Sequence, residues 1–286
     1  MLKSIQYSIE RIIQKLESIN KDDTKISTNK ILTGFHELDK KLNGFNKKQL
    51  IIIAGHPGIG KTSFILSCIS NLLKRSEINT ALYSPSQSID QITKRLLSIR
   101  SGVPYGRLLA GKLDKFEVQI IKQAAKQLEV NHLMVDDSIV EKTDEFIGAI
   151  ENSTFSPDII FIDSLQYAIP KNGDTKSYNF LICKLSNLAV QLNLPIVAIA
   201  DLDGVSADSD FTQQWISLSY FRNKRTFEEQ AAKLISIYRP EYYKIDRDEN
   251  NKQTHGKADL HILKNEDGFE SAVELKYEGK TGAYSV

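Results

Sequence analysis

The stretch IIIAGHPGIGKTSFILSCI, from Ile51 to Ile69, decides the fold. An apolar run, predicted as a strand over 50–55, leads into a glycine-rich loop, and Lys-Thr then opens an apolar segment with helical character. Four residues match the pattern GxxxxGK[ST] without departure: Gly55, Gly60, Lys61 and Thr62. The loop follows a strand and opens a helix, which is the context that this pattern requires. The stretch therefore predicts a loop that binds phosphate groups.

Each part of this loop has a task in holding a nucleoside triphosphate. Its backbone N–H groups would turn inward around phosphate oxygens, at the positive end of the following helix. Lys61 would reach the β- and γ-phosphates, and Thr62 would offer its hydroxyl to Mg²⁺. We therefore expect ATP or ADP with Mg²⁺ as ligands, bound by the loop residues Gly55, Pro57, Gly58, Ile59, Gly60, Lys61, Thr62 and Ser63.

The stretch PDIIFIDSLQYA supplies an acidic residue to match this loop. Asp163 ends an apolar strand predicted over 158–163. An aspartate at this place supports the Mg²⁺ shell in phosphate-loop proteins, although aspartate is also a common turn residue at strand ends. Coupled to the loop upstream, Asp163 is predicted to hold the metal together with Thr62. Lys61 and Asp163 are the predicted catalytic residues.

The composition is that of an ordinary globular protein, with 286 residues, 41% apolar and 26% charged. The formal net charge of +1 excludes a global positive field, so any nucleic-acid surface would have to be local. No apolar run is long enough to span a bilayer, and the charged residues in MLKSIQYSIERIIQKLESIN argue against a signal peptide. Cys68 and Cys183 lie in apolar contexts without a CxxC pattern. We expect a cytoplasmic protein with reduced thiols and no membrane partner.

From Ile31 onward, short apolar strands alternate with longer helical stretches. The predicted strands are residues 50–55, 80–84, 132–137, 158–163, 195–200, 233–238 and 258–263. Near-continuous apolar strands separated by helices predict an α/β domain over 31–286, with a mainly parallel, twisted sheet flanked by helices. Residues 258–277 read as strand, turn and strand, so the sheet should close with a C-terminal antiparallel hairpin. The acidic stretch 201–214 is predicted to be a long loop.

Residues 1–30 have a different pattern. Apolar residues recur at helical spacing and predict an amphipathic helix over 5–19: Ile5, Ile9, Ile12, Ile13, Leu16 and Ile19. The polar segment NKDDTKISTNK then reads as a tether. An amphipathic helix needs a surface that buries its apolar stripe, and the pattern leaves open whether this surface belongs to its own domain or to a neighbouring subunit.

Several stretches, taken in order, resemble one family. They are TGFHELDKKLNGF, the phosphate loop, YSPSQSIDQITKRLLS, GRLLAGKL, VDDS, FIDSLQYA, LNLPIVAIADL, IYRPEYY and ILKNEDG…VELKY, which together cover roughly residues 31–278. They resemble the C-terminal motor domain of replicative DNA helicases of the DnaB family, which has a RecA-like P-loop NTPase fold. The helix over 5–19 resembles the helix with which that family docks each subunit on its neighbour. The resemblance therefore implies a homo-oligomer, a hexameric ring formed through residues 1–20, and we expect no globular N-terminal domain of that family.

The resemblance also shows where this chain departs from the family. The family carries a glutamate after the second strand that orients the attacking water, and Ser86 stands in its place in YSPSQS. The glutamine that senses the γ-phosphate is replaced by Asp201. The family's hairpin offers a lysine and an arginine to the neighbouring subunit's nucleotide; Lys264 keeps the lysine, but Glu266 replaces the arginine.

These replacements bear on hydrolysis more than on binding. A serine hydroxyl cannot act as a carboxylate base at neutral pH, and losing a base typically costs about 10²–10⁴ in rate. An arginine supplied by a neighbour contributes about 10³–10⁵, although such effects need not multiply. The leading hypothesis is therefore a divergent family member that binds ATP or ADP with Mg²⁺ and has weak or lost hydrolysis.

Two alternatives stay open, and with them the question of whether the chain is an enzyme. One is an active ring-shaped helicase or translocase with a rearranged base, for which Asp90 and Glu117 are the nearest downstream acids, both in helical stretches. The other is a non-enzymatic assembly module stabilised by nucleotide.

DNA binding is expected to be weakened. The loop that corresponds to the family's DNA-contacting loop carries the carboxylates of Asp201, Asp203, Asp208 and Asp210, which would repel phosphate. Small basic patches could still form from the remaining lysines and arginines nearby: Lys171, Lys176, Arg222, Lys224 and Arg225.

Overall fold

A nine-stranded sheet forms the centre of the domain. The computed structural model describes residues 30–74, 78–128, 132–138, 142–169, 175–201 and 225–286. The strands lie in the order β11-β10-β9-β8-β3-β7-β6-β4-β5. Their bounds are β3 (Leu50–Gly55), β4 (Thr80–Tyr83), β5 (Leu133–Asp136), β6 (Ile159–Ile162), β7 (Ile196–Asp201), β8 (Lys233–Tyr238), β9 (Lys257–Asn265), β10 (Ser271–Glu278) and β11 (Ala283–Ser285). A separate two-stranded sheet pairs β1 (Lys30–Ile31) with β2 (Phe45–Asn46).

The sheet changes character between β8 and β9. From β5 to β8 every neighbouring pair is parallel. From β8 to β11 every pair is antiparallel. The mainly parallel sheet and its C-terminal hairpin, formed by β9 and β10, are therefore confirmed.

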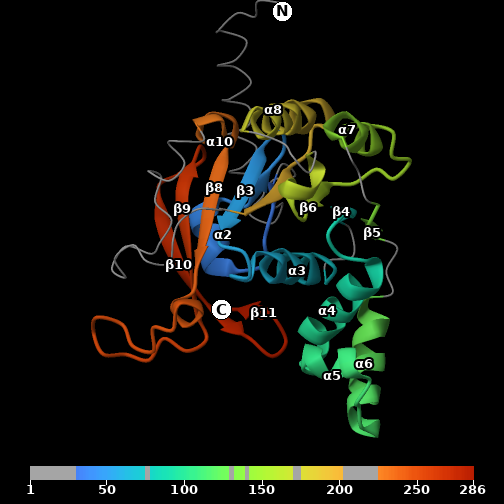
Figure 1. Cartoon of the computed structure of the whole chain (residues 1–286), viewed down its shortest axis with the longest axis vertical. Coiled ribbons are helices and arrows are strands. Elements are labelled where there is room, and N and C mark those ends of the chain that lie inside the picture. Colours follow the sequence, from blue (N-terminus) through green and yellow to red (C-terminus); the bar gives the residue numbers. More distant parts are fainter. Residues whose placement is uncertain (1–29, 75–77, 129–131, 139–141, 170–174, 202–224) are drawn as a thin grey trace, which may run out of the picture. The chain divides into compact units, whose positions relative to one another are not determined.

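Strand β3 shows why the sheet is covered on both faces. Ile51 and Ile53 belong to one hydrophobic core and Leu50, Ile52 and Ala54 to the other, because successive side chains of a strand point to opposite faces. The helices of the first face are α2 (His36–Leu42), α3 (Lys61–Leu72) and α4 (Ile89–Ser101). The second face carries α7 (Thr143–Glu151), α8 (Thr175–Leu192) and α10 (Arg225–Gln230). Figure 1 shows α3 and α8 on opposite sides of β3.

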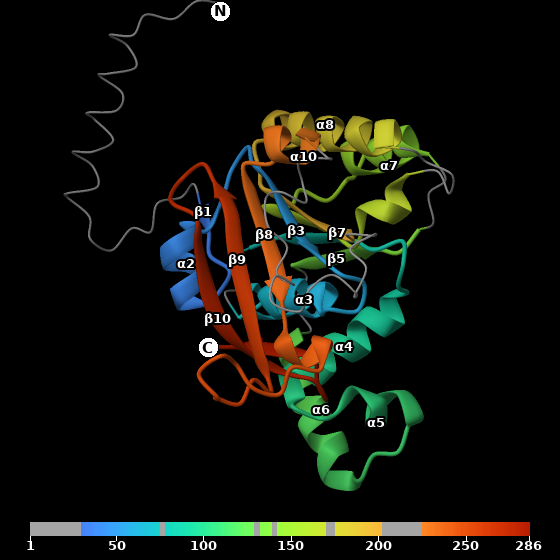
Figure 2. The same ribbon diagram turned by 60° about the vertical axis from the view of Figure 1, so that its left-hand side comes forward.

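Two further helices lie outside this three-layer arrangement. Helices α5 (Tyr105–Ala110) and α6 (Lys115–Leu128) pack beside α4, away from the sheet (Figure 2). Only Ala124 of α6 is buried, and no residue of α5 is. Two short 3-10 helices follow strands on the chain, η1 (Leu165–Ala168) after β6 and η3 (Pro240–Tyr243) after β8. The second corresponds to the turn in IYRPEYY.

The strand predictions hold with small shifts in their ends. The strands expected at 50–55 and 233–238 have the observed bounds of β3 and β8. The loop expected to begin at residue 201 begins later, because Asp201 pairs with Gly55 as the last residue of β7. Residues 202–224, with Asp203, Asp208 and Asp210, lie outside the described residues, as does the helix predicted over 5–19. The division into 1–30 and 31–286 stays a prediction.

Candidate nucleotide-binding site

The loop between β3 and α3 has the backbone that its glycines allow. Gly58 has φ +78° and Gly60, the N-cap of α3, has φ +109°, both in the left-handed region that residues with a Cβ rarely adopt. A Cβ on Gly60 would also lie 2.7 Å from the hydroxyl oxygen of Tyr284. Both glycines are therefore required by geometry, which agrees with the loop predicted from the sequence.

Side chains from the C-terminal half of the chain hold this loop from outside. The Tyr242 hydroxyl donates to the carbonyl oxygen of Pro57 at 2.8 Å, and Arg239 Nη1 donates to that of Ile59 at 3.2 Å. The Arg239 guanidinium stacks on the Tyr277 ring, 3.7 Å from its centroid. Because two loop carbonyls are bound in this way, the opposite side of the loop is left to its N–H groups.

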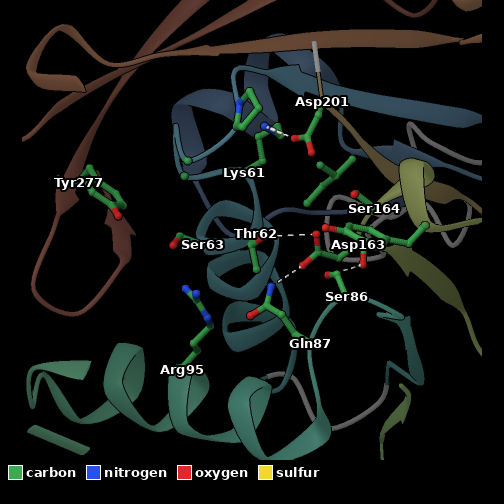
Figure 3. Close-up of a pocket in the computed structure, with 15 residues that line it drawn as sticks. Lys61, Thr62, Ser63, Ser86, Gln87, Arg95, Asp163, Ser164, Asp201 and Tyr277 are labelled. Atoms are coloured by element: carbon green, nitrogen blue, oxygen red, sulfur yellow. Dashed lines mark hydrogen bonds and ion pairs between the residues drawn. The ribbon is translucent and has the colours of Figure 1, made fainter. Parts of the chain in front are cut away.

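A cavity of about 370 Å³ opens beside the loop. Parallel strands bring their carboxyl ends to the same edge of a sheet, and the cavity lies where β3, β4, β6 and β7 end. Figure 3 shows its lining side chains converging from these four strand ends and from α4. The lining residues are Pro57, Gly58, Gly60, Lys61, Thr62, Ser63, Ser86, Gln87, Arg95, Asp163, Ser164, Tyr167, Ile199, Asp201 and Tyr277.

Lys61 is buried in this cavity and pairs with Asp201. The Lys61 side chain is 5% exposed, and its ammonium nitrogen lies 2.6 Å from Asp201 Oδ1. The ammonium also donates to the carbonyl oxygens of Gly55 and His56, at 2.8 and 2.6 Å. Its position between the end of β7 and the start of α3 places its charge where a phosphate chain bound to the loop would lie.

Asp163 lies on the other side of α3's first turn. The Thr62 hydroxyl donates to Asp163 Oδ1 at 3.2 Å, and Gln87 Nε2 donates to Oδ2 at 3.2 Å (Figure 3). Burial raises the pKa of Asp163 to about 6; the charge of Asp201 raises it further, and the Thr62 hydrogen bond opposes the shift. A carboxylate joined to the hydroxyl of the phosphate-loop threonine is the donor set that Mg²⁺ prefers.

The residues at the replaced catalytic positions divide into two groups. Ser86 and Asp201 line the cavity, and the Ser86 hydroxyl donates to the backbone carbonyl oxygen of Asp163 at 3.2 Å. Lys264 and Glu266 do not line it. The Lys264 ammonium instead donates to the carbonyl oxygens of Glu228 and Ala231, at 2.8 and 2.7 Å, and pairs with Glu266 at 3.2 Å.

Other predicted residues fall behind or outside the cavity. Gly55 and Ile59 are buried behind the loop rather than lining it. Neither candidate for a relocated base lines it: Asp90 is exposed on α4, and Glu117 pairs with Arg107 at 2.7 Å.

Three lining residues were not predicted from the sequence: Gln87, Arg95 and Tyr277. Gln87 directly precedes Ser88, whose side chain caps α4, and this serine is the one local signal that the segment lies at a helix start. Arg95 lies further along α4, and its guanidinium stacks on Tyr105 at 4.9 Å. Nothing in the local sequence indicates that this face of α4 borders the phosphate loop.

The basic patches considered for DNA binding are only partly described. Lys176 is exposed on α8, and Arg225 pairs with Glu229 on α10. Lys171, Arg222 and Lys224 lie outside the described residues. Within the described part of the chain, no helix combines the length and the hydrophobicity that crossing a bilayer requires.

Comparison with known proteins identifies the fold and the family. The family model described as "DnaB-like helicase C terminal domain" matches residues 30–285. The chain is 28% identical to "Replicative DNA helicase DnaB" of Haemophilus influenzae and 26% identical to that of Geobacillus stearothermophilus, over 95% and 96% of this chain. It spans 58% and 60% of the length of these two relatives.

Solved structures agree with this match. One, whose title describes an ATPase domain, superposes with a TM-score of 0.83 at 20% identity, covering 100% of this chain and 99% of that one. A second, of a DnaB-like replicative helicase, superposes with a TM-score of 0.80 at 20% identity, covering 96% of this chain and 66% of that one. Both the predicted RecA-like fold and the predicted resemblance are confirmed. The chain belongs to the DnaB-like helicase C-terminal domain family.

Proposed function

We propose that this domain binds ATP or ADP with Mg²⁺ in the cavity beside the phosphate loop, and that it hydrolyses ATP weakly or not at all. The observation that carries the proposal is the contact between Thr62 and Asp163, with Oγ1 and Oδ1 3.2 Å apart. It joins the predicted metal-binding residues from two elements that are far apart in the sequence, beside a buried Lys61.

The residues present fit a magnesium nucleotide. The N–H groups at the start of α3 and the Lys61 ammonium supply positive charge for phosphate oxygens. Thr62 and Asp163 would hold Mg²⁺, which neutralises phosphate charge when it is bound. The Arg95 guanidinium in the lining adds a second cation to the cavity. Binding therefore needs no residue that the chain lacks.

Hydrolysis requires a group that orients and deprotonates water, and the carboxylates of the cavity are already engaged. Among the described lining residues, these carboxylates are Asp163 and Asp201. Asp163 accepts hydrogen bonds from Thr62 and Gln87, and Asp201 is engaged with Lys61. Ser86 stands where the family has its glutamate, and its hydroxyl is not a base at neutral pH. The loss of a general base typically lowers the rate by about 10²–10⁴.

The hairpin that carries Lys264 and Glu266 supports the same proposal. The Lys264 ammonium donates to the carbonyls of Glu228 and Ala231 at the end of α10, and to Glu266 near the end of its own strand. These contacts cap a helix terminus of the same chain, where a cation is favourable. A hairpin of this kind presents a carboxylate where an arginine would contribute about 10³–10⁵ to phosphoryl transfer.

The wider role proposed for the chain comes from its relatives. The matched relatives are named replicative DNA helicases, and this chain spans little more than half of their length. We propose that the domain serves DNA replication, as a nucleotide-binding subunit of a homo-oligomeric, hexameric ring joined through residues 1–20. Its contact with DNA would be weakened by the carboxylates that follow β7.

A titration of a fluorescent ATP analogue in the presence of Mg²⁺ tests binding. We expect a saturable signal that is lost in Lys61→Ala and kept in Lys264→Ala, because Lys264 lies outside the cavity. Both variants remove one ammonium, so the change of net charge is matched. The absence of binding at high micromolar nucleotide, with no difference between Lys61→Ala and the unaltered protein, would refute the proposal.

A second candidate, an active DNA-dependent motor, is favoured by the names of the relatives. Its signature is ATP turnover that rises with single-stranded DNA and is lost in Asp163→Ala. If this turnover reaches about one per second or more, a usual value for an enzyme, the replaced residues do not disable the site and the proposal of weak hydrolysis is wrong.

A further inference from the structure

The ion pair between Lys61 and Asp201 gives the cavity a property beyond nucleotide binding. The ammonium of Lys61 lies within hydrogen-bond distance of three oxygens: two loop carbonyls and Asp201 Oδ1. An ammonium carries three protons. One of the three positions that Lys61 could offer to a phosphate is therefore directed at a carboxylate that belongs to the protein.

The fold fixes Asp201 at this position. Asp201 is the last residue of β7 and lies opposite Gly55, the last residue of β3, in the parallel ladder between the two strands. Both strands are central in the sheet, with buried side chains along their length. Because the strand end is held by the ladder, the carboxylate is tethered beside the first residue of the phosphate loop, and only side-chain rotation can move it away.

This arrangement distinguishes a third phosphate from the first two. A γ-phosphate oxygen bound to Lys61 and Asp201 Oδ1 would share one nitrogen, so the two anions would lie within about 5–6 Å of each other. Two like charges at this separation repel strongly in the partly buried environment of a protein surface cavity. The α- and β-phosphates are held mainly by the loop N–H groups at the start of α3, so their binding depends less on the Lys61 ammonium.

We propose that Asp201 is a specificity-determining residue that makes this site select nucleoside diphosphates over nucleoside triphosphates. The inference rests on the proposed function and deepens it by naming the ligand class. The Asp201 carboxylate takes the place of the terminal phosphate as the partner of Lys61. A diphosphate leaves this ion pair intact, whereas a triphosphate has to compete with it.

The other charges of the cavity act less selectively. Asp163 is joined to Thr62 and Gln87, on the metal side of the site. Arg95 reaches the cavity from α4 and attracts the phosphates of both ligands. Since Asp201 is 26% exposed, solvent screens part of its repulsion, and the selectivity should be moderate: about 10- to 100-fold in the dissociation constant.

Isothermal titration calorimetry with Mg²⁺ tests the proposal, using ADP and an ATP analogue with a non-hydrolysable β–γ bridge. For the unaltered chain we expect ADP to bind about 10- to 100-fold more tightly than the analogue. In Asp201→Asn and Asp201→Gln the analogue should bind more tightly and ADP should change by less than about threefold, so that the two affinities approach each other. Asp144→Asn, which removes an exposed carboxylate of α7 outside the cavity, is the charge-matched control and should keep the selectivity.

The outcomes separate the selectivity from the site itself. Equal affinities in the unaltered chain, or a substitution at Asp201 that tightens both ligands alike, would overturn the selectivity and leave the nucleotide site standing. Failure of both ligands to bind any variant would overturn the site and the selectivity together. The comparison within the unaltered chain needs no substitution, so it decides the question even if a variant at Asp201 does not fold.

Discussion

Replacing Asp163 with asparagine should change how the stability of this domain depends on pH. Burial raises the pKa of Asp163 to about 6, from an ordinary value of 3.8. Between these two values the folded protein holds a proton on this carboxyl that the unfolded chain has lost. The contribution of this proton to stability is therefore present at low pH and is lost as the pH rises through about 6.

The size of the effect follows from the two pKa values. Each pKa unit corresponds to about 1.4 kcal/mol, so moving from near pH 4.5 to near pH 8 should cost the unaltered domain about 2 kcal/mol that the Asp163→Asn domain does not lose. The side chain is 5% exposed, so solvent screening does not reduce this figure much. The mutation itself shifts stability by a constant, which cancels when the two pH values are compared.

Urea unfolding followed by circular dichroism at the two pH values measures this difference. Asp144→Asn, on the exposed face of α7, is the matched control, and its stability should differ from that of the unaltered domain by less than about 0.5 kcal/mol at both pH values. A stability difference between the Asp163→Asn and unaltered domains that stays constant with pH, or that changes in the opposite direction, would refute the reasoning. In either case the carboxyl would not be held in the desolvated environment that its contacts with Thr62 and Gln87 indicate.

Three other substitutions probe the loop and the replaced catalytic positions. Gly60→Ala should lower nucleotide affinity more than about tenfold, since its Cβ would lie 2.7 Å from the Tyr284 hydroxyl in a left-handed backbone; calorimetry with ADP measures this, and an unchanged affinity would contradict the geometry. Tyr242→Phe removes a 2.8 Å hydrogen bond to Pro57 and should weaken the same binding about 3- to 10-fold, whereas a larger loss would indicate a direct contact with the ligand. The triple substitution Ser86→Glu, Asp201→Gln and Glu266→Arg should raise ATP turnover at least about 10²-fold in a phosphate-release assay, and no increase would show that hydrolysis is limited elsewhere.

The fold could be predicted from the sequence because its strands are encoded locally. The residues Leu50–Gly55 are apolar throughout and are followed by a glycine-rich loop, so both the strand and its end are visible in the sequence. The same holds for Asp163, which ends an apolar run. The parallel sheet brings these two strand ends to one edge, and that step needed only the general rule for parallel strands.

The pairings within the site could not be predicted, because they depend on distances between elements. Asp201 was expected after a strand, but its contact with Lys61 follows from the register between β3 and β7, which no local pattern specifies. Lys264 was expected to serve a neighbouring subunit's nucleotide, yet its ammonium binds carbonyls at the end of α10. Arg95 became visible only when α4 was placed beside the phosphate loop.

The account's central claim is that the site holds a nucleotide and does little to cleave it. A single-turnover measurement tests both parts at once: the domain, in excess over ATP labelled at the γ-phosphate and with Mg²⁺ present, is filtered at intervals, and bound ATP and released phosphate are counted. We predict that labelled ATP is retained on the protein, that Lys61→Ala abolishes the retention, and that release of phosphate is slower than about one turnover per minute with or without single-stranded DNA. Release of the label within seconds, or retention that does not depend on Lys61, would contradict the claim.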